Sequence, residues 1–214
     1  GLLCGLLVEV ECTFTNGGAN VGARTDLGAA NIVERFQFWD LSNQVRHATK
    51  GSHIALLNSC KMGSWFGGAV APNLPYNVGN VNTVSELNAT IAAAGGTRTG
   101  RMFYYIPIAY NMLSDLRGAI WANVTNAQYQ LQITLNANCG SVATDPNDKV
   151  YSGLVAATDL VMSNVSVKVT QIYYDQLPRD NQGAPLLPWI DLSWNYCLND
   201  TQWTGLTANA ENTY

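Results

Sequence analysis

The sequence predicts an all-β protein built as an antiparallel sandwich, because three separate stretches alternate between apolar and polar residues. In residues 129–136 every odd position is apolar and every even position is Gln, Thr or Asn. Residues 6–15 and 161–170 largely follow the same period of two. A strand sends alternate side chains to opposite faces, whereas a helix would spread them around its circumference. We therefore expect these strands to form the framework of the fold, organised around residues 129–136.

The first part of the chain should form strands joined by turns. A strand over residues 2–15 ends at an Asn-Gly-Gly turn, which suits a backbone with positive φ. Residues 21–25 predict a weaker strand. The β-branched and aromatic residues of 32–39 predict the next strand, with Phe36 and Phe38 on one face.

A short strand over residues 44–48 should lead into the single predicted helix, residues 54–61. Thr49 or Ser52 is a suitable N-cap residue for this helix, and Gly63 follows its end. A short helix in a connection between strands does not change the all-β class.

A Gly- and Pro-rich loop over residues 64–80 carries Trp65 and Phe66. A loop of this length is functional or serves as an interaction arm. Strands over residues 81–90 and 98–108 should follow, and the second has a proline near its end, where a missing backbone donor does least harm.

In the last part, residues 113–124 fit helical spacing but contain a glycine that weakens a helix. The strand over 129–136 follows, then a loop over 139–148, a long strand over 159–175 and a compact apolar stretch over 186–198. The long strand should carry four valines on one face: Val161, Val165, Val167 and Val169.

A chain of 214 residues is long enough for one large β-domain with a substantial core. Eight or so antiparallel strands, with a short helix in the connections, predict a two-layer sandwich. The eight-stranded jelly roll is the variety of sandwich that we expect.

Charge is scarce in this sequence. Asp, Glu, Lys and Arg make up 12% of the residues, about half of the usual fraction. Neutral polar strand faces lose their water more easily than charged ones, so much of the surface is expected to lie against neighbouring molecules. The simpler interpretation is a soluble β-protein that happens to be poor in charge. The net charge of −4 and the scattered basic residues argue against a nucleic-acid groove.

The ends of the sequence suggest a piece of a longer protein. The chain starts in a strand-like run and stops at Tyr214 without a closing element. The apolar run near residues 2–8 is too short to span a bilayer and lacks the features of a signal peptide.

The five cysteines are widely spaced and contain no Cys-x-x-Cys pair. This pattern predicts neither a disulfide framework nor a zinc site, so we expect reduced, partly buried thiols. Four Asn-x-Ser/Thr sequences are present, about as many as chance produces, and one of them, at Asn164, lies inside a predicted strand.

The residues that could carry chemistry do not form a recognisable catalytic or metal site. His47 and His53 could meet at a strand-to-helix junction, but no third ligand is well spaced, and two solvent-facing or capping residues are the simpler interpretation. Glu9 and Glu11 could pair as carboxylates, or simply lie on a solvated strand face. We predict a protein that is not an enzyme, with no catalytic residue, bound cofactor or metal.

Asp145 and Asp148 could help to bind calcium, although turn chemistry explains them as well. The aromatic residues of predicted loops are the other candidates. They could contact other subunits, stack on sugars or plug the ends of the sandwich. We name as candidate subunit-contact residues Trp65, Phe66, Trp189, Trp194 and Trp203.

Several short blocks, in order along nearly the whole chain, resemble the major capsid proteins of tectiviruses, which have a double jelly roll. Two of them read Tyr-Tyr-Ile-Pro-Ile-Ala-Tyr at residues 104–110 and Leu-Leu-Pro-Trp-Ile-Asp-Leu-Ser at residues 186–193. No single block is diagnostic, but their number and order are. The other blocks are residues 5–10, 25–33, 43–47, 89–93, 116–124, 174–178 and 205–209.

The resemblance implies a structural shell protein of an icosahedral virus with an internal membrane and double-stranded DNA. It implies a homotrimer of pseudo-hexagonal outline, contacts with other capsid and vertex proteins and with the internal membrane, and no direct contact with nucleic acid. Such a protein is made in the host cytoplasm and resides in the virion. Residues 1–178 would form the first jelly roll, and residues 179–214 a connecting segment toward a second jelly roll that this chain lacks.

Two alternatives come from the residues themselves. The loop tryptophans and the Asn-x-Ser/Thr sequences also fit a secreted carbohydrate-binding jelly roll. An enzyme on a cupin-like barrel would use His47 and His53 as metal ligands.

Overall fold

The computed structural model describes most of the chain between residues 1 and 200. The described residues are 1–62, 87, 89–112, 115–122, 125, 128–140, 148–156, 158–176, 179–184 and 197–200. The five candidate aromatic residues, Trp65, Phe66, Trp189, Trp194 and Trp203, therefore lie outside the described residues.

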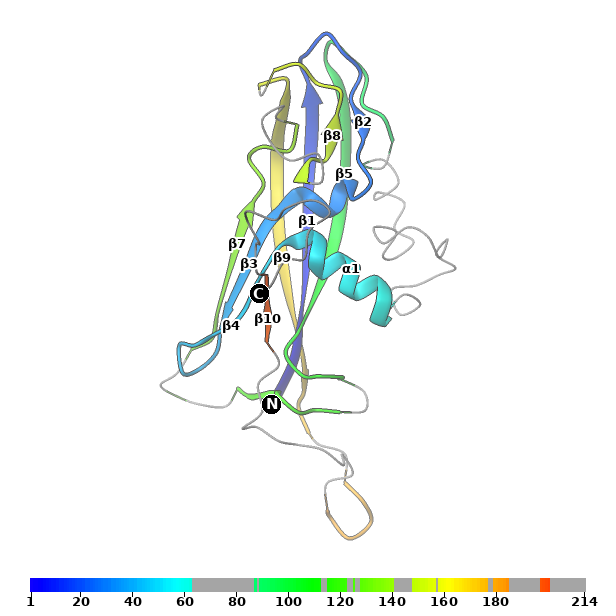
Figure 1. The fold of residues 1–214 in the computed structure, drawn as a ribbon. Helices are drawn as coiled ribbons and strands as arrows, with labels where there is room; N and C mark the ends of the chain where they lie inside the picture. Colours follow the sequence, from blue (N-terminus) through cyan, green and yellow to red (C-terminus); the bar gives the residue numbers. More distant parts are fainter. Residues whose placement is uncertain are drawn as a thin grey trace, which may run out of the picture.

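The first sheet is built around β1 (Leu2–Asn16), which runs between two other long strands. β5 (Gly96–Pro107) pairs with one edge of β1 and β9 (Leu160–Tyr174) with the other, both antiparallel. The short β6 (Ile120–Trp121) pairs with the start of β1. Figure 1 shows these long strands running along the length of the molecule. The central strand is thus β1, and the stretch over 129–136 that we expected at the centre lies in the other sheet.

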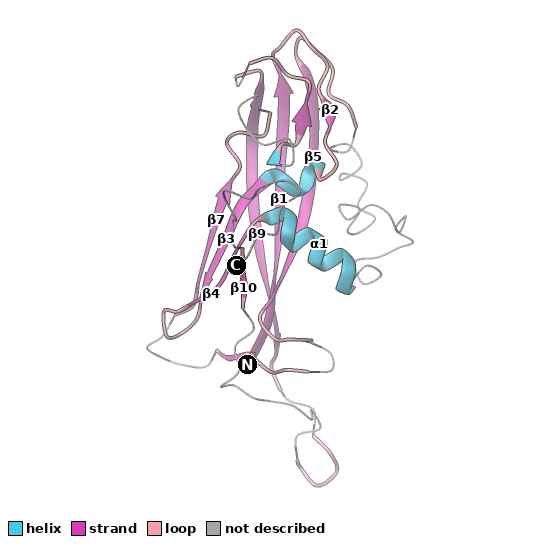
Figure 2. Cartoon of the chain, in the orientation of Figure 1, coloured by secondary structure: helices cyan, strands magenta, loops and turns pink. Residues whose placement is uncertain are grey.

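The second sheet has the order β10-β4-β3-β7 and faces the first sheet (Figure 2). β3 (Val33–Trp39) pairs antiparallel with β4 (Val45–Thr49) and with β7 (Gln130–Leu135). β10 (Leu198–Asn199) pairs parallel with β4. Two further short strands, β2 (Ala23–Arg24) and β8 (Tyr151–Ser152), pair with each other.

Two helical elements have bounds within the described part of the chain. The 3-10 helix η1 (Gly28–Ile32) lies just before β3, and α1 (Gly51–Met62) follows β4. α1 confirms the predicted helix, although it begins three residues earlier than expected. η1 was not predicted, because a single buried turn leaves no periodic pattern in a sequence.

The core lies between the two sheets. The even-numbered side chains of β1 from Leu6 to Phe14 are buried against Phe36 and Phe38 of β3, which share one face as predicted. The Tyr104 hydroxyl donates a hydrogen bond to the Ala30 carbonyl, 3.0 Å away, and so ties β5 to η1. A smaller apolar cluster covers the opposite face of β1 near its start. It contains Leu2, Cys4, Tyr105, Ala109, Met112, Leu116 and Ala119.

Two strand pairs, β1–β9 in the first sheet and β3–β7 in the second, follow the pattern of a jelly roll. The first strand, β1, pairs with the late strand β9, and the next long strand, β3, pairs with β7 inside that pair. Early and late strands are nested in this way when a long hairpin wraps around a sandwich. The predicted fold class, all-β and antiparallel with a short helix in a connection, is confirmed. Among the described residues, no helix is long and apolar enough to cross a membrane.

Candidate assembly surface

β9 forms an open edge of the first sheet. Across the described residues, β1 is the only strand paired with β9, so the backbone groups on its outer edge lack a partner strand there. Fifteen residues of extended chain are available along this edge. Unpaired strand edges of this length are templates for pairing with another strand.

The inner face of β9 continues the layer of apolar side chains that β1 buries. Val169 lies opposite Val8, and Val167 lies opposite Val10. The two β1 valines are 0% exposed, whereas Val167 is 42% and Val169 is 45% exposed. The second sheet therefore covers the inner face of β1 but leaves the same layer open over β9.

A β-bulge at Asn164 corrects the expectation that four valines share one face. Asn164 has a φ of 50°, and the register with β1 shifts between Glu11 and Thr13. An extra residue in one strand moves the following side chains to the other face. Val161, opposite Thr15, therefore lies on the outer face, whereas Val165 stays on the inner face with Val167 and Val169.

The apolar face of the second sheet is also partly exposed, at its β7 edge, on the same side of the molecule as β9. Figure 1 shows β7 and β9 at the left side of the two layers. Leu131, Ile133 and Leu135 of β7 alternate as half-buried residues that pack against the core. We call the inner faces of β9 and β7, with the valines and these three residues, the open side.

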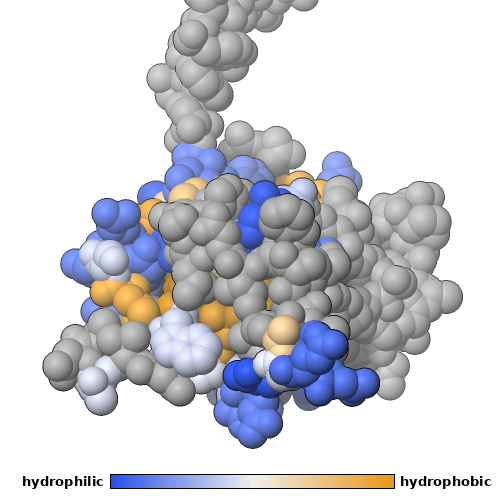
Figure 3. Space-filling model, turned by 90° about the horizontal axis from the view of Figure 1, so that it is seen from below, coloured by the Kyte–Doolittle hydropathy of each residue, from blue (hydrophilic) through white to orange (hydrophobic). Residues whose placement is uncertain are grey.

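A second exposed region lies at the end of the molecule where β1 begins. Tyr110 and Trp121 are 45% exposed there, and the Arg117 guanidinium lies 5.6 Å from the centre of the Tyr110 ring. Arg117 also forms an ion pair with Asp115, at 2.6 Å. Figure 3, which looks at this end from below, shows hydrophobic residues among hydrophilic ones.

The carboxylates singled out in the sequence have structural partners. Glu9 and Glu11 share the outer face of β1, and Arg101 of β5 binds both, at 2.8 and 3.7 Å. Arg101 therefore joins the two carboxylates in an ion-pair network that links β1 to β5. Asp148 forms an ion pair with Lys50 at 2.8 Å, and Asp145 lies outside the described residues.

The two histidines have different environments. His47 of β4 is completely buried, which corrects the expectation of a solvent-facing residue. His53 of α1 is half-exposed, and its Nδ1 atom lies 2.7 Å from the Asp200 carboxylate. Within the described part of the chain, no group of three or more His, Cys, Asp or Glu side chains could hold a metal ion.

Asp200 ties the end of the described chain to the start of α1. Its carboxylate accepts hydrogen bonds from the Thr49 hydroxyl and the Lys50 amide, both at 2.6 Å. Burial raises the pKa of Asp200, but the bonds from Thr49, His53 and Lys50 outweigh burial and hold that pKa below its usual value. Thr49 and Lys50, the two residues just before α1, are therefore held by a residue about 150 positions later in the chain.

A buried ion pair stabilises the turn between β3 and β4. The Arg46 Nε atom donates to Asp40 Oδ2 at 3.1 Å, and Arg46 Nη1 donates to the Gly118 carbonyl at 2.6 Å. Burial raises the pKa of Asp40, yet hydrogen bonds from Gln44, Arg46 and Ser42 lower it below its usual value. These contacts attach the turn to the connection between β5 and β6.

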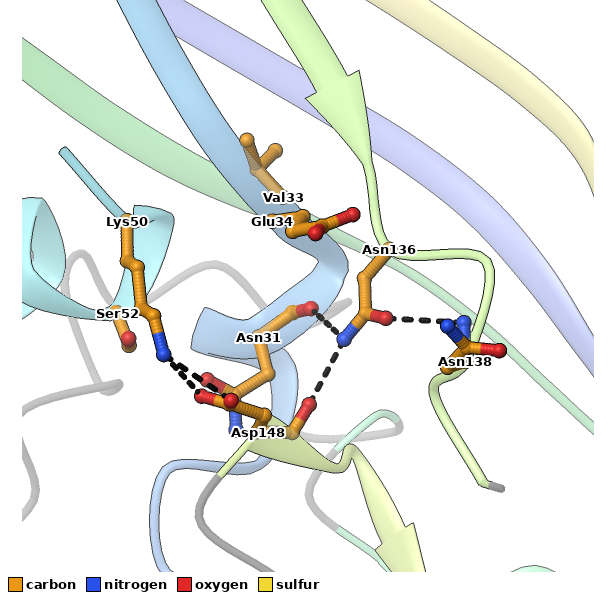
Figure 4. A pocket seen from close by; sticks show the side chains of 8 residues that line it. All are labelled: Asn31, Val33, Glu34, Lys50, Ser52, Asn136, Asn138 and Asp148. Atoms are coloured by element: carbon orange, nitrogen blue, oxygen red, sulfur yellow. Dashed lines mark hydrogen bonds and ion pairs between the residues drawn. The ribbon is translucent and has the colours of Figure 1, made fainter. Parts of the chain in front are cut away.

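A pocket of about 250 Å³ lies beside η1, the start of α1 and the end of β7. Its polar groups mostly bind one another (Figure 4). The Asn136 side-chain amide donates to the carbonyls of Asn31 and Asp148, at 3.0 and 2.8 Å, while Lys50 binds the Asp148 carboxylate. This network joins three connections between strands. The polar groups of the pocket therefore stabilise the fold.

The cysteines whose side chains the structure describes are free thiols. Cys4, Cys12 and Cys139 are buried, and Cys197 is exposed. Burial raises the pKa of Cys4 to about 11 and those of Cys12 and Cys139 to about 12. The buried thiols are thus protonated and unreactive at neutral pH, as reduced structural cysteines are.

A family model described as P3 major capsid protein N-terminal matches residues 1–177. The major capsid protein P3 of Enterobacteria phage PRD1 is 37% identical over 215 aligned residues, which include 99% of this chain and 53% of that protein. The chain therefore spans about half the length of this curated relative. A solved structure, the crystal structure of the STIV MCP, superposes with a TM-score of 0.49 at 12% identity, covering 81% of this chain and 40% of that one.

Proposed function

Because this chain belongs to the family of P3 major capsid protein N-terminal domains, we propose that it is the N-terminal part of a major capsid protein of a tectivirus-like virus. The protein acts by shape and self-association and performs no catalytic step. The match over residues 1–177 carries the proposal. The low charge content and the open side support it, since both favour a surface that neighbouring protein covers.

The finer features of the proposal concern the assembly. The complete protein forms homotrimers with a pseudo-hexagonal outline, which pack with other capsid and vertex proteins over an internal membrane around double-stranded DNA. It is made in the host cytoplasm and resides in the virion. Residues 1–178 form its first jelly roll, and residues 179–214 connect that domain to a second one. Trp65, Phe66, Trp189, Trp194 and Trp203 lie in loops that contact other subunits.

Expression of the complete reading frame that contains this sequence tests the proposal. Mass measurement by light scattering after size-exclusion chromatography should give three times the mass of one chain, and negative-stain micrographs should show particles with a hexagonal outline. A protein that stays monomeric at high concentration and under virion-like ionic conditions would contradict the proposal.

A further inference from the structure

We propose that the free edge of β9 pairs with a β-strand of the same polypeptide, from the part that follows residue 214 in the complete protein. This strand also covers the open side. This inference rests on the proposed function, because it takes the complete protein to be about as long as its relative.

The character of the β9 edge is the first argument. Proteins protect exposed edge strands with charges, proline, β-bulges or short length. The bulge at Asn164 interrupts β9 near its start, and the register with β1 is regular from Ser166 to Ile172, with a further shift in β1 between Leu3 and Gly5 at the far end. β9 has fifteen residues, no proline and a single charge, Lys168, which lies opposite Glu9 on the outer face. The inner face of β9 thus carries no charge to oppose the approach of another strand.

The continuity of the core is the second argument. Val167 and Val169 belong to the same layer as Val8 and Val10, whose side chains are fully buried. On the facing sheet, the apolar residues of β7 are half-buried at the same side. The open side is therefore an unfinished part of a core, rather than a separate patch on a closed surface.

An unfinished core favours the same chain over a second copy as the covering partner. A domain generally folds as a unit around its own core, so a segment of the same chain can complete that core before the chain meets a second copy. A complete protein as long as the PRD1 relative would also have enough length for this role, because this chain aligns with only 53% of that relative. The remaining part of such a protein can supply a strand together with the apolar side chains that cover the valines.

Hydrogen–deuterium exchange on the complete protein, read by mass spectrometry, tests the inference. It is measured on the trimer and on monomers obtained by dilution or mild dissociation. We expect β9 peptides to exchange about as slowly as β1 peptides in both forms, since both edges of β9 would be bonded. Protection in the trimer alone would assign the cover to a second copy, and rapid exchange in both forms would mean that nothing covers β9. Either result would overturn the inference.

A pair of substitutions gives a second measurement. Val167→Lys places a charge on the inner face, and Ser166→Lys places the same charge on the outer face opposite Glu11. If the strand is covered, Val167→Lys should speed exchange of β9 about tenfold or more in the complete monomer, while Ser166→Lys should leave it unchanged. Equal tolerance of both substitutions would contradict the inference. If the complete protein forms no trimer, the proposed function fails, but the monomer measurements still decide whether β9 is covered within the chain.

Discussion

The Nδ1 atom of buried His47 accepts a hydrogen bond from the backbone amide of Leu198, 3.1 Å away and 151 residues later in the chain. An imidazole nitrogen accepts only when it carries no proton. Burial lowers the pKa of His47 to about 4, the backbone of Pro107 opposes this shift, and the nearby Arg46 charge adds to it. The neutral side chain therefore holds β10 against β4.

This histidine should make the protein sensitive to mild acid. In the unfolded chain its pKa is about 6.5 and in the folded protein about 4, so between these values the unfolded state binds the proton. Stability is then complete above about pH 6.5 and declines as the pH falls toward 4, by about 3 kcal/mol in total. Urea unfolding at a series of pH values measures this decline.

His47→Gln is the matched variant, because its side-chain oxygen can still accept from Leu198 but does not titrate. Its stability should stay nearly constant over the same pH range. Asp40 and Asp200 have lowered pKa values and titrate below the window that His47 occupies. Parallel pH profiles for the wild type and the variant would show that another group causes the decline.

Replacement of Asp200 should destabilise the start of α1. Asp200→Ala removes the acceptor of the Thr49 hydroxyl and the Lys50 amide, and we expect a loss of about 1–2 kcal/mol. Asp175→Asn, at an exposed turn residue, serves as a control for the change in charge. Thermal unfolding compares the variants, and equal midpoints for Asp200→Ala and the control would show that these bonds do not stabilise the start of α1.

A side chain at Gly51 should disrupt the contact between α1 and β3. A Cβ atom at this position would lie 2.5 Å from the Val33 carbonyl oxygen and 3.1 Å from that of Ala30. Both neighbours are backbone atoms and cannot move aside easily, so Gly51→Ala should cost about 1–3 kcal/mol.

Gly17→Ala is the matched control for this substitution. Its Cβ atom would meet only the Asp159 carbonyl oxygen, at an ordinary contact distance of 3.9 Å. Chemical denaturation should separate the two variants clearly. A Gly51→Ala protein as stable as Gly17→Ala would show that the helix can shift to make room.

Thiol labelling should distinguish the exposed cysteine from the buried ones. Cys197 is exposed and should react within minutes with an alkylating reagent at neutral pH. Cys4, Cys12 and Cys139 should react only after unfolding, because burial raises their pKa values and blocks access. Mass spectrometry of proteolytic peptides assigns each site, and Cys197→Ser gives the background. Rapid native labelling of Cys12 would show that the core opens readily.

The positions of most long strands were predictable from short segments. Alternating side chains at residues 2–15 and 159–175 predicted β1 and β9 to within two residues at either end, because the period of two is a local property of strands. The helix after β4 was also predictable from its flanking residues. The short strands β6 and β8 were not, since two residues carry no periodic signal.

The candidate surface was predictable only in part. The sequence indicated low charge and valine-rich strand faces, both of which belong to the open side. It did not reveal that β9 lies at an edge, and it placed Val161 on the wrong face, because the bulge at Asn164 depends on the register with β1. The surroundings of His47 and Asp200 were hidden for the same reason, since their partners lie about 150 residues away.

The sequence by itself determined that this protein is an antiparallel β-sandwich with neutral polar strand faces, because alternation and composition act residue by residue. The tertiary structure decided which strand is central, which edge is free and which valines remain uncovered. Strand pairing joins segments far apart in the chain, so the burial of a side chain such as Val167 depends on neighbours that its own segment does not specify.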